Sequence, residues 1–362
     1  MERLLSLSMI VRNEEKVLAR ALSGVRDAVD EIVIADTGST DGTVSVAESF
    51  GAKVVSFPWR DDFAAARNFS FSLATCPYVM WLDADDVVTE ENAALLKKLR
   101  ERLKNESPDT VMCRYDVAFD AAGRPTCSYI RERVLKREGC PPWHGRVHEC
   151  IPPFGKIIFS HFTVKHGETP GKVRGERNLA IYRKAVSEGE ELDARHLFYY
   201  GRELTAAKLY REAESVLKEA ISSSGWATGK IEASKTLADC LIALRREDEA
   251  MSVLLESFRF GSPRAAVCCK IGALFRKKDM PKEAIFWYKA ALAAGDHSLE
   301  GDFEQPECRG VIPLVELTAC YWRTGERDRA YKCHLAARDV APEHPSVVYN
   351  DAFFRERGYP LL

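Results

Sequence analysis

The sequence lacks the features that would place it in a membrane or outside the cell. No apolar run approaches the roughly 20 residues that a membrane-spanning helix needs. Residues 1–6 lead directly into a strand pattern, without the layout of a signal peptide. The 11 cysteines are an odd number and form no C-x-x-C pairs of the metal-binding kind. We therefore expect reduced thiols and a cytoplasmic location.

An excess of charge of one sign is also missing. The chain has 52 Lys and Arg against 54 Asp and Glu, a formal net charge of -2. This balance does not indicate nucleic acid or an anionic membrane as a partner. Hydrophobic residues make up 46% of the chain and charged residues 29%, as in globular proteins. With 362 residues, the chain is too long for one ordinary core, so two domains are expected.

Two common nucleotide-binding fingerprints are absent as well. No G-x-G-x-x-G follows the first predicted strand, and the sequence has no Walker A loop. A nucleotidyltransferase would be expected to carry a Gly-rich loop with Lys or Arg directly after that strand. Residues 11–14, Val-Arg-Asn-Glu, are not such a loop. These absences disfavour dinucleotide enzymes, P-loop enzymes and nucleotidyltransferases.

What the sequence does contain is a buried strand that ends in carboxylates. Residues 78–82 are apolar, and Asp83, Asp85 and Asp86 follow. In an extended chain, residues two apart face the same side, so Asp83 and Asp85 are expected to point together and Asp86 away. Paired carboxylates suit Mg²⁺ or Mn²⁺, which bridge phosphate oxygens. An acidic turn before the next helix is the alternative.

The first 87 residues alternate between strand and helix patterns. Strands are expected at residues 4–11, 31–36 and 53–57 and at the apolar run above, with helical spacing between them. This order favours a mostly parallel sheet with helices on its faces. The loops that follow the strands then converge at one edge of the sheet, as a nucleotide site requires.

Two residues in these loops are candidates for nucleotide binding. Asp36, followed by Thr37 and Gly38, is a candidate to accept a hydrogen bond from a base or ribose. Arg67 is a candidate to neutralise phosphate or to hold a carboxylate in place. An Asx-turn for Asp36 and a surface ion pair for Arg67 are equally open.

Residues 110–119, 127–136 and 156–165 are rich in β-formers, and a hairpin connection is expected at residues 120–125. The loop between the last two strands contains Trp143, His148 and Glu149. Such a mixture of aromatic, imidazole and carboxylate groups can form an acceptor site. His148 or His166 is a candidate third metal ligand, and Glu149 a candidate base. A structural histidine and a surface glutamate are the alternatives.

From residue 174 onward the composition is helical and repeats. Equivalent alanines stand at positions 213, 250, 284 and 330, which subtraction places 37, 34 and 46 residues apart. This spacing is near the 34-residue tetratricopeptide period, with an insertion around residues 295–309. Stacked helical hairpins offer a concave surface for a peptide or a second copy of the chain. Acceptor binding, homodimer formation and a purely structural role all remain open.

Together, these stretches resemble the nucleotide-sugar half of family 2 glycosyltransferases with the GT-A fold. The matching motifs lie at residues 8–15, 36–41, 61–68 and 82–86. Residues 143–149 and 166–167 are similar to the subgroup in which tetratricopeptide helices follow, to which the sublancin S-glycosyltransferase belongs. The resemblance implies an α/β GT-A domain over residues 1–170 and an all-α repeat domain over residues 171–362.

The resemblance also implies an inverting transfer of a sugar from a nucleoside diphosphate, commonly UDP, aided by Mn²⁺ or Mg²⁺. Asp36 would contact the base. Asp83, Asp85 and His166 would hold the metal, with Asp85 touching it most directly. The expected nucleotide-sugar contacts are Val11, Arg12, Asn13, Glu14, Asp36, Thr37, Gly38, Asp62, Arg67, Asp83, Ala84 and Asp85.

One departure from the family concerns the catalytic base. Many members carry an E-D pair, and no clear copy lies between Asp86 and His166. Glu149 is the substitute and Asp86 the second candidate, with Trp143 expected beside His148 at the acceptor. The predicted protein is a hexosyltransferase that acts on a peptide or protein side chain. A polysaccharide, a lipid-linked sugar and a nucleic-acid base remain possible acceptors, and a scaffold with a vestigial sugar site is the alternative.

Overall fold

The structure is a computed structural model that describes residues 3–120, 123–167, 176–297, 303 and 305–360. It divides into two compact units, Met1–Leu192 and Asp193–Leu362. The predicted domain boundary between residues 170 and 171 lies outside the described residues.

The first unit is built on one mixed sheet of eight strands. The order is β3 (Lys53–Ser56), β2 (Glu31–Asp36), β1 (Leu5–Val11), β4 (Tyr78–Trp81), β7 (Pro125–Lys136), β6 (Thr110–Phe119), β8 (Ile157–His166) and β5 (Asp86–Val87). The first four strands in this order pair in parallel, and so do β6 and β8. Antiparallel pairings join β4 to β7, β7 to β6 and β8 to β5. The expected α/β fold with a mostly parallel sheet is confirmed.

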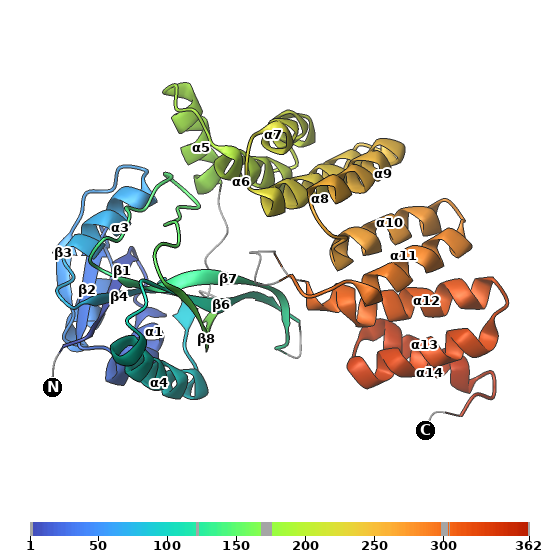
Figure 1. Ribbon diagram of the computed structural model, residues 1–362, viewed down its shortest axis with the longest axis horizontal. Coiled ribbons are helices and arrows are strands. Elements are labelled where there is room, and N and C mark those ends of the chain that lie inside the picture. The colour runs from blue at the N-terminus through green and yellow to red at the C-terminus, as the bar shows by residue number, and fades with distance from the viewer. Residues whose placement is uncertain (1–2, 121–122, 168–175, 298–302, 304, 361–362) are drawn as a thin grey trace. The chain divides into compact units, whose positions relative to one another are not determined.

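Helices cover both faces of this sheet (Figure 1). Leu5, Leu7 and Met9 of β1 join the apolar core that α1 and α4 complete on one face. On the other face, the hydroxyl of Ser8 lies 2.7 Å from that of Ser70 in α3. Alternate residues of β1 thus serve two different layers, as the pleat requires. The helices of this unit are α1 (Leu18–Val25), α2 (Thr43–Ser49), α3 (Phe63–Ser72), α4 (Glu90–Glu106) and α5 (Arg177–Ser187), with a short 3₁₀ turn η1 (Arg26–Ala28).

The carboxyl ends of the parallel strands meet at one edge of the sheet. In the parallel register, Val11 at the end of β1 stands beside Asp36 at the end of β2. Trp81 at the end of β4 stands beside Ser8, so the residues after it continue toward the level of Val11. The loops that follow β1, β2 and β4 therefore lie at the same edge, as expected from the sequence.

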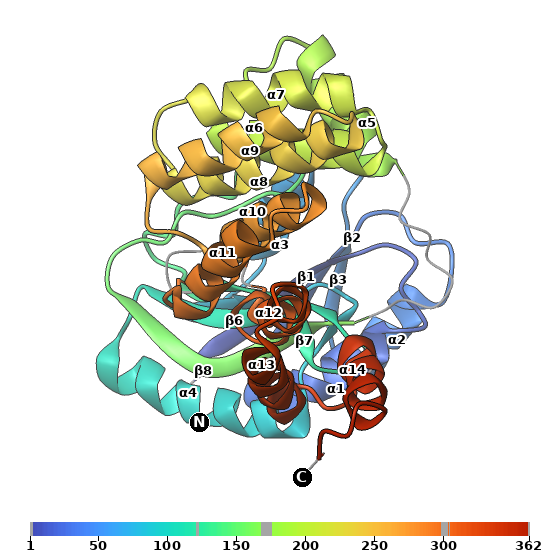
Figure 2. The same cartoon turned by 90° about the vertical axis from the view of Figure 1, so that its right-hand side faces the viewer.

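The second unit consists of helical hairpins that follow one another along the chain (Figures 1 and 2). The predicted all-α repeat architecture is confirmed. Its helices are α6 (Ala194–Ala206), α7 (Tyr210–Ser222), α8 (Ala227–Ala243), α9 (Glu247–Glu256), α10 (Ala265–Lys277), α11 (Pro281–Ala293), α12 (Val311–Arg323), α13 (Arg327–Val340) and α14 (Pro345–Arg355), with 3₁₀ turns η2 (Ser257–Phe260) and η4 (Pro306–Arg309).

Two features recur in each hairpin. The equivalent alanines are fully buried in the second helices, at positions Ala213, Ala250, Ala284 and Ala330. Five residues before each alanine, the turn between the helices holds a residue with left-handed φ, namely Lys208, Arg245, Asp279 and Gly325. A small residue lets the two helices approach closely, and the left-handed residue ends the first helix. The repeat is therefore visible in the backbone as well as in the sequence.

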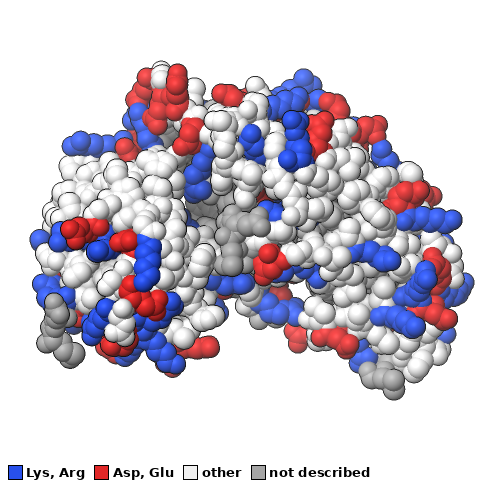
Figure 3. All heavy atoms as spheres, viewed as in Figure 1, with Lys and Arg blue, Asp and Glu red and all other residues white. Residues whose placement is uncertain are grey.

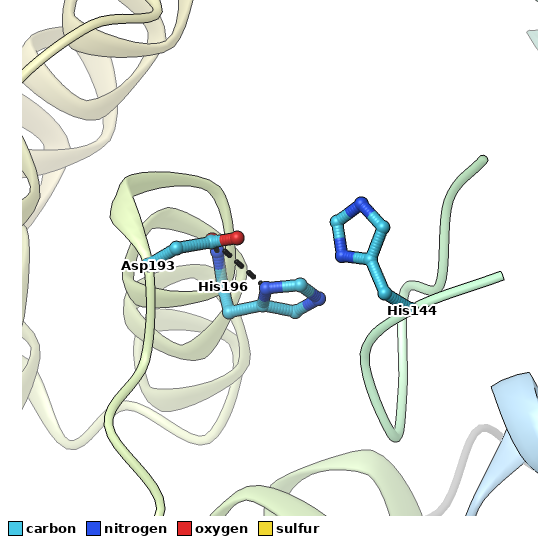
Figure 4. A group of neighbouring side chains, drawn as sticks. All are labelled: His144, Asp193 and His196. Carbon is cyan, nitrogen blue, oxygen red and sulfur yellow. Dashed lines mark hydrogen bonds and ion pairs between the residues drawn. The ribbon is translucent and has the colours of Figure 1, made fainter. Parts of the chain in front are cut away.

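Two surface features are a side-chain cap at the start of α6 and charged side chains of both signs. Asp193 caps α6 by accepting hydrogen bonds from the backbone N–H and the Nδ1 of His196, both at 2.8 Å (Figure 4). On the face drawn in Figure 3, positive and negative side chains are interspersed. Among the described residues, no helix is both long enough and apolar enough to cross a membrane.

Candidate active site

The acidic stretch forms a turn, because β4 ends at Trp81. The backbone N–H of Asp86 donates to the carbonyl of Asp83 at 3.1 Å, and the N–H of Asp83 donates to Oδ2 of Asp86 at 3.0 Å. The alternation that was expected to point Asp83 and Asp85 to the same side holds only in extended backbone. That argument is wrong here, and the turn decides where each carboxylate lies.

Asp86 is fully buried and is held by donors on both of its oxygens. Nη1 of Arg133 donates to its Oδ2 at 3.0 Å, and the hydroxyl of Tyr115 donates to its Oδ1 at 2.8 Å. Burial raises the pKa of Asp86 to about 6, although the charge of Arg133 opposes the shift. A carboxylate with no exposed surface and two engaged oxygens is a structural partner of Arg133. The sequence-based suggestion of Asp86 as a base stays a prediction that this burial disfavours.

Arg67 connects the acidic turn to the loop before β8. Its buried guanidinium donates from Nε to Oε1 of Glu149 at 2.5 Å and from Nη2 to Oδ1 of Asp83 at 2.6 Å. The guanidinium also lies 4.7 Å from the ring centre of Trp81 and 5.0 Å from that of Trp143. Two carboxylates and two aromatic faces thus fix this cation in one geometry. Among the roles left open for Arg67, the structure shows the holding of carboxylates, and its burial does not fit a surface ion pair.

The arginines also decide the charge state of Asp83. Burial alone would raise the pKa of this carboxyl group, but the positive charges of Arg67 and Arg133 outweigh the burial and lower the pKa to about 2. Burial would lower the pKa of Arg67, but the carboxylates of Asp83 and Glu149 outweigh the burial and raise it. Asp83 is therefore ionised at neutral pH, and one of its oxygens is already engaged by a cation.

The loop from residue 143 to 149 is fixed to α3. The backbone N–H and carbonyl of Trp143 pair with the side-chain amide of Asn68, both at 2.9 Å. Trp143 is only 3% exposed and its ring packs against Arg67, so its proposed contact with an acceptor stays a prediction. His148 has left-handed φ and stacks on Tyr182 of α5 at 6.2 Å between ring centres.

His166 lies beside the acidic turn because the last residues of β8 pair with β5, where His166 stands opposite Asp86. Its Nδ1 is 3.1 Å from the hydroxyl oxygen of Tyr115 and 3.7 Å from Oδ1 of Asp85. The N–H of Gly167 donates to the carbonyl of Asp85 at 2.9 Å. A Cβ at Gly167 would lie 2.4 Å from that carbonyl oxygen, so only glycine allows this close approach.

The predicted metal ligands are brought together only in part. Ligand atoms of Asp85, Asp86 and His166 lie within 4.8 Å of one another, whereas Asp83 turns to Arg67. Protein donors occupy both oxygens of Asp86, so Asp85 and His166 are the candidates in this group to bind an ion. Carboxylate oxygen with imidazole nitrogen suits Mn²⁺ or Mg²⁺, which commonly take one or two protein ligands and complete their shell with phosphates and water. The donor set therefore fits such an ion.

The loops after β1 and β2 are tied to each other. The N–H of Asn13 donates to the Ser39 hydroxyl at 3.0 Å, and Oδ1 of Asn13 accepts from the N–H of Thr40 at 2.8 Å. Asp36 accepts hydrogen bonds from the backbone N–H groups of Gly38 and Ser39, which is the Asx-turn left open by the sequence. Its proposed contact with a base stays a prediction.

The other predicted nucleotide contacts have mostly local roles. The carbonyl of Val11 accepts from the N–H and the hydroxyl of Thr37, at 2.9 and 3.0 Å. Asp62 caps α3 by accepting from the N–H of Ala65 at 2.8 Å. The side chain of Arg12 is exposed at the end of β1, where it is available to a ligand. Two further predicted contacts are buried beside these loops, Glu14 and Ala84.

The sequence-based reasoning missed the residues behind the site, Tyr115 in β6 and Arg133 in β7. Arg133 is fully buried, 3.8 Å from the ring centre of Trp81 and 4.2 Å from that of Tyr115. Burial, together with the charge of Asp86, raises the pKa of Tyr115 well above its usual range. The sequence did contain one signal, since Arg133 directly precedes the apolar pair Val134 and Leu135 in a predicted strand. A cation at such a buried position needs a carboxylate partner.

Residues 6–161 match the family model of glycosyl transferase family 2. The first unit contains a family 2 glycosyl transferase domain. The match includes the acidic turn, Arg67 and Glu149, and it ends shortly before His166. The resemblance stated from the sequence motifs is therefore confirmed for this part of the chain.

Two relatives are similar to parts of this chain. The SPbeta prophage-derived glycosyltransferase SunS of Bacillus subtilis is 28% identical over 230 residues, which cover 60% of this chain and 53% of SunS. A TPR repeat-containing protein of Synechococcus elongatus is 48% identical over 81 residues, or 22% of this chain and 20% of that protein. The chain thus spans about half of SunS and a fifth of the second relative.

Among solved structures, one similar chain is glucosyl-3-phosphoglycerate synthase from Mycobacterium tuberculosis in complex with Mn²⁺, UDP and phosphoglyceric acid. The match is 20% identical, has a TM-score of 0.29, and covers 38% of this chain and 56% of that one. A likeness at this level describes only a partial overlap of the two folds.

Proposed function

We propose that the protein transfers a sugar from a nucleoside diphosphate sugar, with UDP as the expected nucleotide, to an acceptor nucleophile. The observation that carries this proposal is the arrangement around Arg67. One side of its guanidinium holds Glu149, and the other holds Asp83 at the start of the turn that contains Asp85. A candidate base and a candidate diphosphate site are thereby linked through one rigid cation at the carboxyl edge of the sheet.

Glu149 is the proposed base. Its Oε1 is occupied by Arg67, whereas no described residue donates a hydrogen bond to its Oε2. In the proposed step, the acceptor hydrogen passes to Oε2 of Glu149 as the acceptor atom bonds to the anomeric carbon. The bond from that carbon to the diphosphate oxygen breaks, and the nucleoside diphosphate leaves with the electron pair. A single displacement of this kind inverts the anomeric centre.

Asp85 and His166 would hold Mn²⁺ or Mg²⁺. When bound, such an ion would neutralise negative charge that develops on the diphosphate. The protein contributes the fixed positions of the two side chains: the turn places Asp85, and the pairing of β8 with β5 places His166. The loops after β1 and β2 would take the nucleoside, with the exposed Arg12 near it.

We further propose a polypeptide side chain as the acceptor, presented by the helical hairpins of the second unit. Stacked hairpins commonly bind peptides, which supports this choice over a polysaccharide or a lipid-linked sugar. The setting proposed is the cytoplasm, in line with the absence of disulfides among the described cysteines. Mass spectrometry of proteins co-expressed with the chain would show an added hexose mass on a peptide if the acceptor is correctly assigned.

The activity itself is tested with purified full-length protein, a panel of UDP- and GDP-sugars, and Mn²⁺. Transfer to water or to an added acceptor is expected for at least one donor. Glu149→Gln should lower this rate by roughly 10²–10⁴-fold, the usual contribution of a general base, while nucleotide binding is retained. Glu138→Gln, an exposed glutamate of the same unit, is the matched control. A wild-type rate in Glu149→Gln would exclude Glu149 as the base.

A further inference from the structure

Four side chains form one continuous chain of contacts behind the proposed metal site. Arg133 donates to Oδ2 of Asp86 at 3.0 Å, the Tyr115 hydroxyl donates to Oδ1 of Asp86 at 2.8 Å, and the same hydroxyl oxygen lies 3.1 Å from Nδ1 of His166. These residues come from β7, β5, β6 and β8. Neighbouring strands of the sheet therefore connect a fully buried ion pair to a partly exposed imidazole.

The number of protons available in this chain is limited. A tyrosine hydroxyl has one hydrogen, and here it points to the carboxylate of Asp86. Asp86 has no proton of its own to offer while it is ionised beside Arg133 and the N–H of Asp83. The contact between the Tyr115 oxygen and Nδ1 of His166 is therefore a hydrogen bond only if Nδ1 is the donor. Without a hydrogen on Nδ1, two lone pairs would face each other at 3.1 Å.

A second acceptor favours the same arrangement. Oδ1 of Asp85 lies 3.7 Å from Nδ1 of His166, so two oxygens, those of Asp85 and Tyr115, face this nitrogen. Nε2, by contrast, has no hydrogen-bond partner among the described residues, and the side chain is 32% exposed. The environment of the ring is thus asymmetric, with acceptors on one nitrogen and an open side at the other.

We infer that Tyr115, oriented by the Arg133–Asp86 pair, is a positioning residue that keeps His166 in the Nδ1–H tautomer, so that Nε2 presents its lone pair to a divalent cation. A neutral imidazole binds a metal only through the nitrogen without hydrogen, and a hydrogen bond at the other nitrogen fixes which one this is. The inference rests on the proposed function only in assigning the cation to the sugar-donor site.

The tautomer is measured directly on metal-free protein. In a ¹⁵N-histidine NMR spectrum, the His166 signals are assigned by comparison with His166→Gln, which removes one of the eight histidines. The inference predicts a protonated Nδ1 and an Nε2 with the shift of an unprotonated nitrogen at neutral pH. A protonated Nε2 with an unprotonated Nδ1 would overturn it. This readout requires neither the ion nor any transferase activity.

The role of Tyr115 is then tested with Tyr115→Phe, which keeps the ring and removes the hydroxyl. Outer-layer partners of metal-binding histidines typically change metal affinity by 10- to 100-fold, and a loss in this range is expected in Mn²⁺ titration calorimetry. The kcat at saturating Mn²⁺ should change much less than the Mn²⁺ concentration needed for half-maximal rate. In the same variant, the NMR spectrum should show a mixture of the two His166 tautomers.

Tyr129→Phe is the matched control, because the ring of Tyr129 packs edge-on against Tyr115 at 5.6 Å and the change likewise removes one hydroxyl. Equal Mn²⁺ affinity in wild-type protein, Tyr115→Phe and Tyr129→Phe would overturn the inference. An Nδ1–H tautomer in a protein that turns over no sugar donor would instead support the positioning role and refute only the proposed function.

Discussion

The two units of the molecule differ in how far apart in sequence their essential contacts lie. In the first unit, Arg67 binds Glu149, 82 residues away, and Arg133 binds Asp86, 47 residues away. In the second unit, the recurrent features are a left-handed turn residue and an alanine five positions later, both within one hairpin. Contacts that recur within each hairpin build the second unit, whereas the candidate active site of the first unit depends on pairings between segments far apart in the sequence. The comparison predicts that substitutions in the two units will have different costs.

The largest effect on stability is expected for Asp86→Asn. This change leaves the fully buried guanidinium of Arg133 without its counter-charge, which typically costs about 3–5 kcal/mol. The loss should appear in urea unfolding as an earlier transition of the first unit, with hydrogen exchange in α7 to α13 unchanged. The double variant Asp86→Asn with Arg133→Met should recover much of the loss. A double variant that is less stable than the single one would contradict the pairing.

A smaller effect is expected for Gly272→Ala in the second unit. A Cβ at Gly272 would lie 2.9 Å from an edge carbon of the buried Tyr288 ring, and a rigid ring cannot move aside locally. Overpacking of this kind costs about 1–3 kcal/mol, which exceeds the gain of about 0.5–1 kcal/mol for alanine in a helix. Thermal unfolding should show the loss, and Gly295→Ala, where an added Cβ would lie no closer than 3.7 Å to a neighbouring atom, should not show a steric effect.

Acid should weaken the first unit through Asp30, which binds Arg100 at both oxygens and accepts from the N–H groups of Leu4 and Leu5. Although its partial burial acts in the opposite direction, these donors lower its pKa to about 2 from the usual 3.8. Because the folded pKa is lower than the unfolded one, this stabilisation is present above about pH 4 and is lost as the pH falls toward 2.

Asp30→Asn should therefore unfold more easily than wild-type protein at pH 7, by about 1–2 kcal/mol, near the lower end for hydrogen bonds to a charged group because solvent partly screens this one. The difference should shrink below pH 4 in denaturant titrations. Asp27→Asn, an exposed neighbour in a 3.6 Å ion pair with Lys97, is the control and should change stability little. A gap between Asp30→Asn and wild type that stays constant from pH 7 to pH 2 would argue against the assignment.

The smallest effect on stability is expected at the turns between the two helices of a hairpin. Lys208 is exposed and has φ of 61°, at the position where the last hairpin has Gly325 with φ of 84°. Because a side chain in the left-handed region is strained, Lys208→Gly should raise stability by a few tenths to about 1 kcal/mol, and Gly325→Lys should lower it by a similar amount. Chemical denaturation of the two variants provides the check, and shifts of the same sign would show that the two turns are not equivalent.

Much of this architecture follows from the sequence. The alternating strand and helix patterns of the first 87 residues predicted the parallel strands and the edge where their loops meet. The repeat was readable because its signals are local and recur. The orientation of Asp83 was not readable, because β4 ends at Trp81 and a turn replaces the expected extended backbone. A turn of this kind depends on Arg133 and Asp86, which pair across the sheet.

The roles of Tyr115 and Arg133 could not be predicted for a related reason. Both lie in β-rich runs that read as ordinary strands, and their importance comes from which strands are neighbours. The sheet places β7 beside β4 and β8 beside β5, and only this order brings Tyr115 to Asp86 and His166. Such pairings join residues far apart in the sequence and cannot be predicted from it, whereas the carboxylates form a local motif that can be recognised.

In the proposed function, Asp85 and His166 hold a divalent cation with a nucleoside diphosphate, while Glu149 acts as the base on the other side of Arg67. Titration calorimetry of UDP in the presence and absence of Mn²⁺ separates these roles. We expect Mn²⁺-dependent UDP binding in the wild-type protein and in Glu149→Gln, and its loss in Asp85→Asn. Binding of UDP that is unaffected by Mn²⁺, or that is equally strong in Asp85→Asn, would contradict the account.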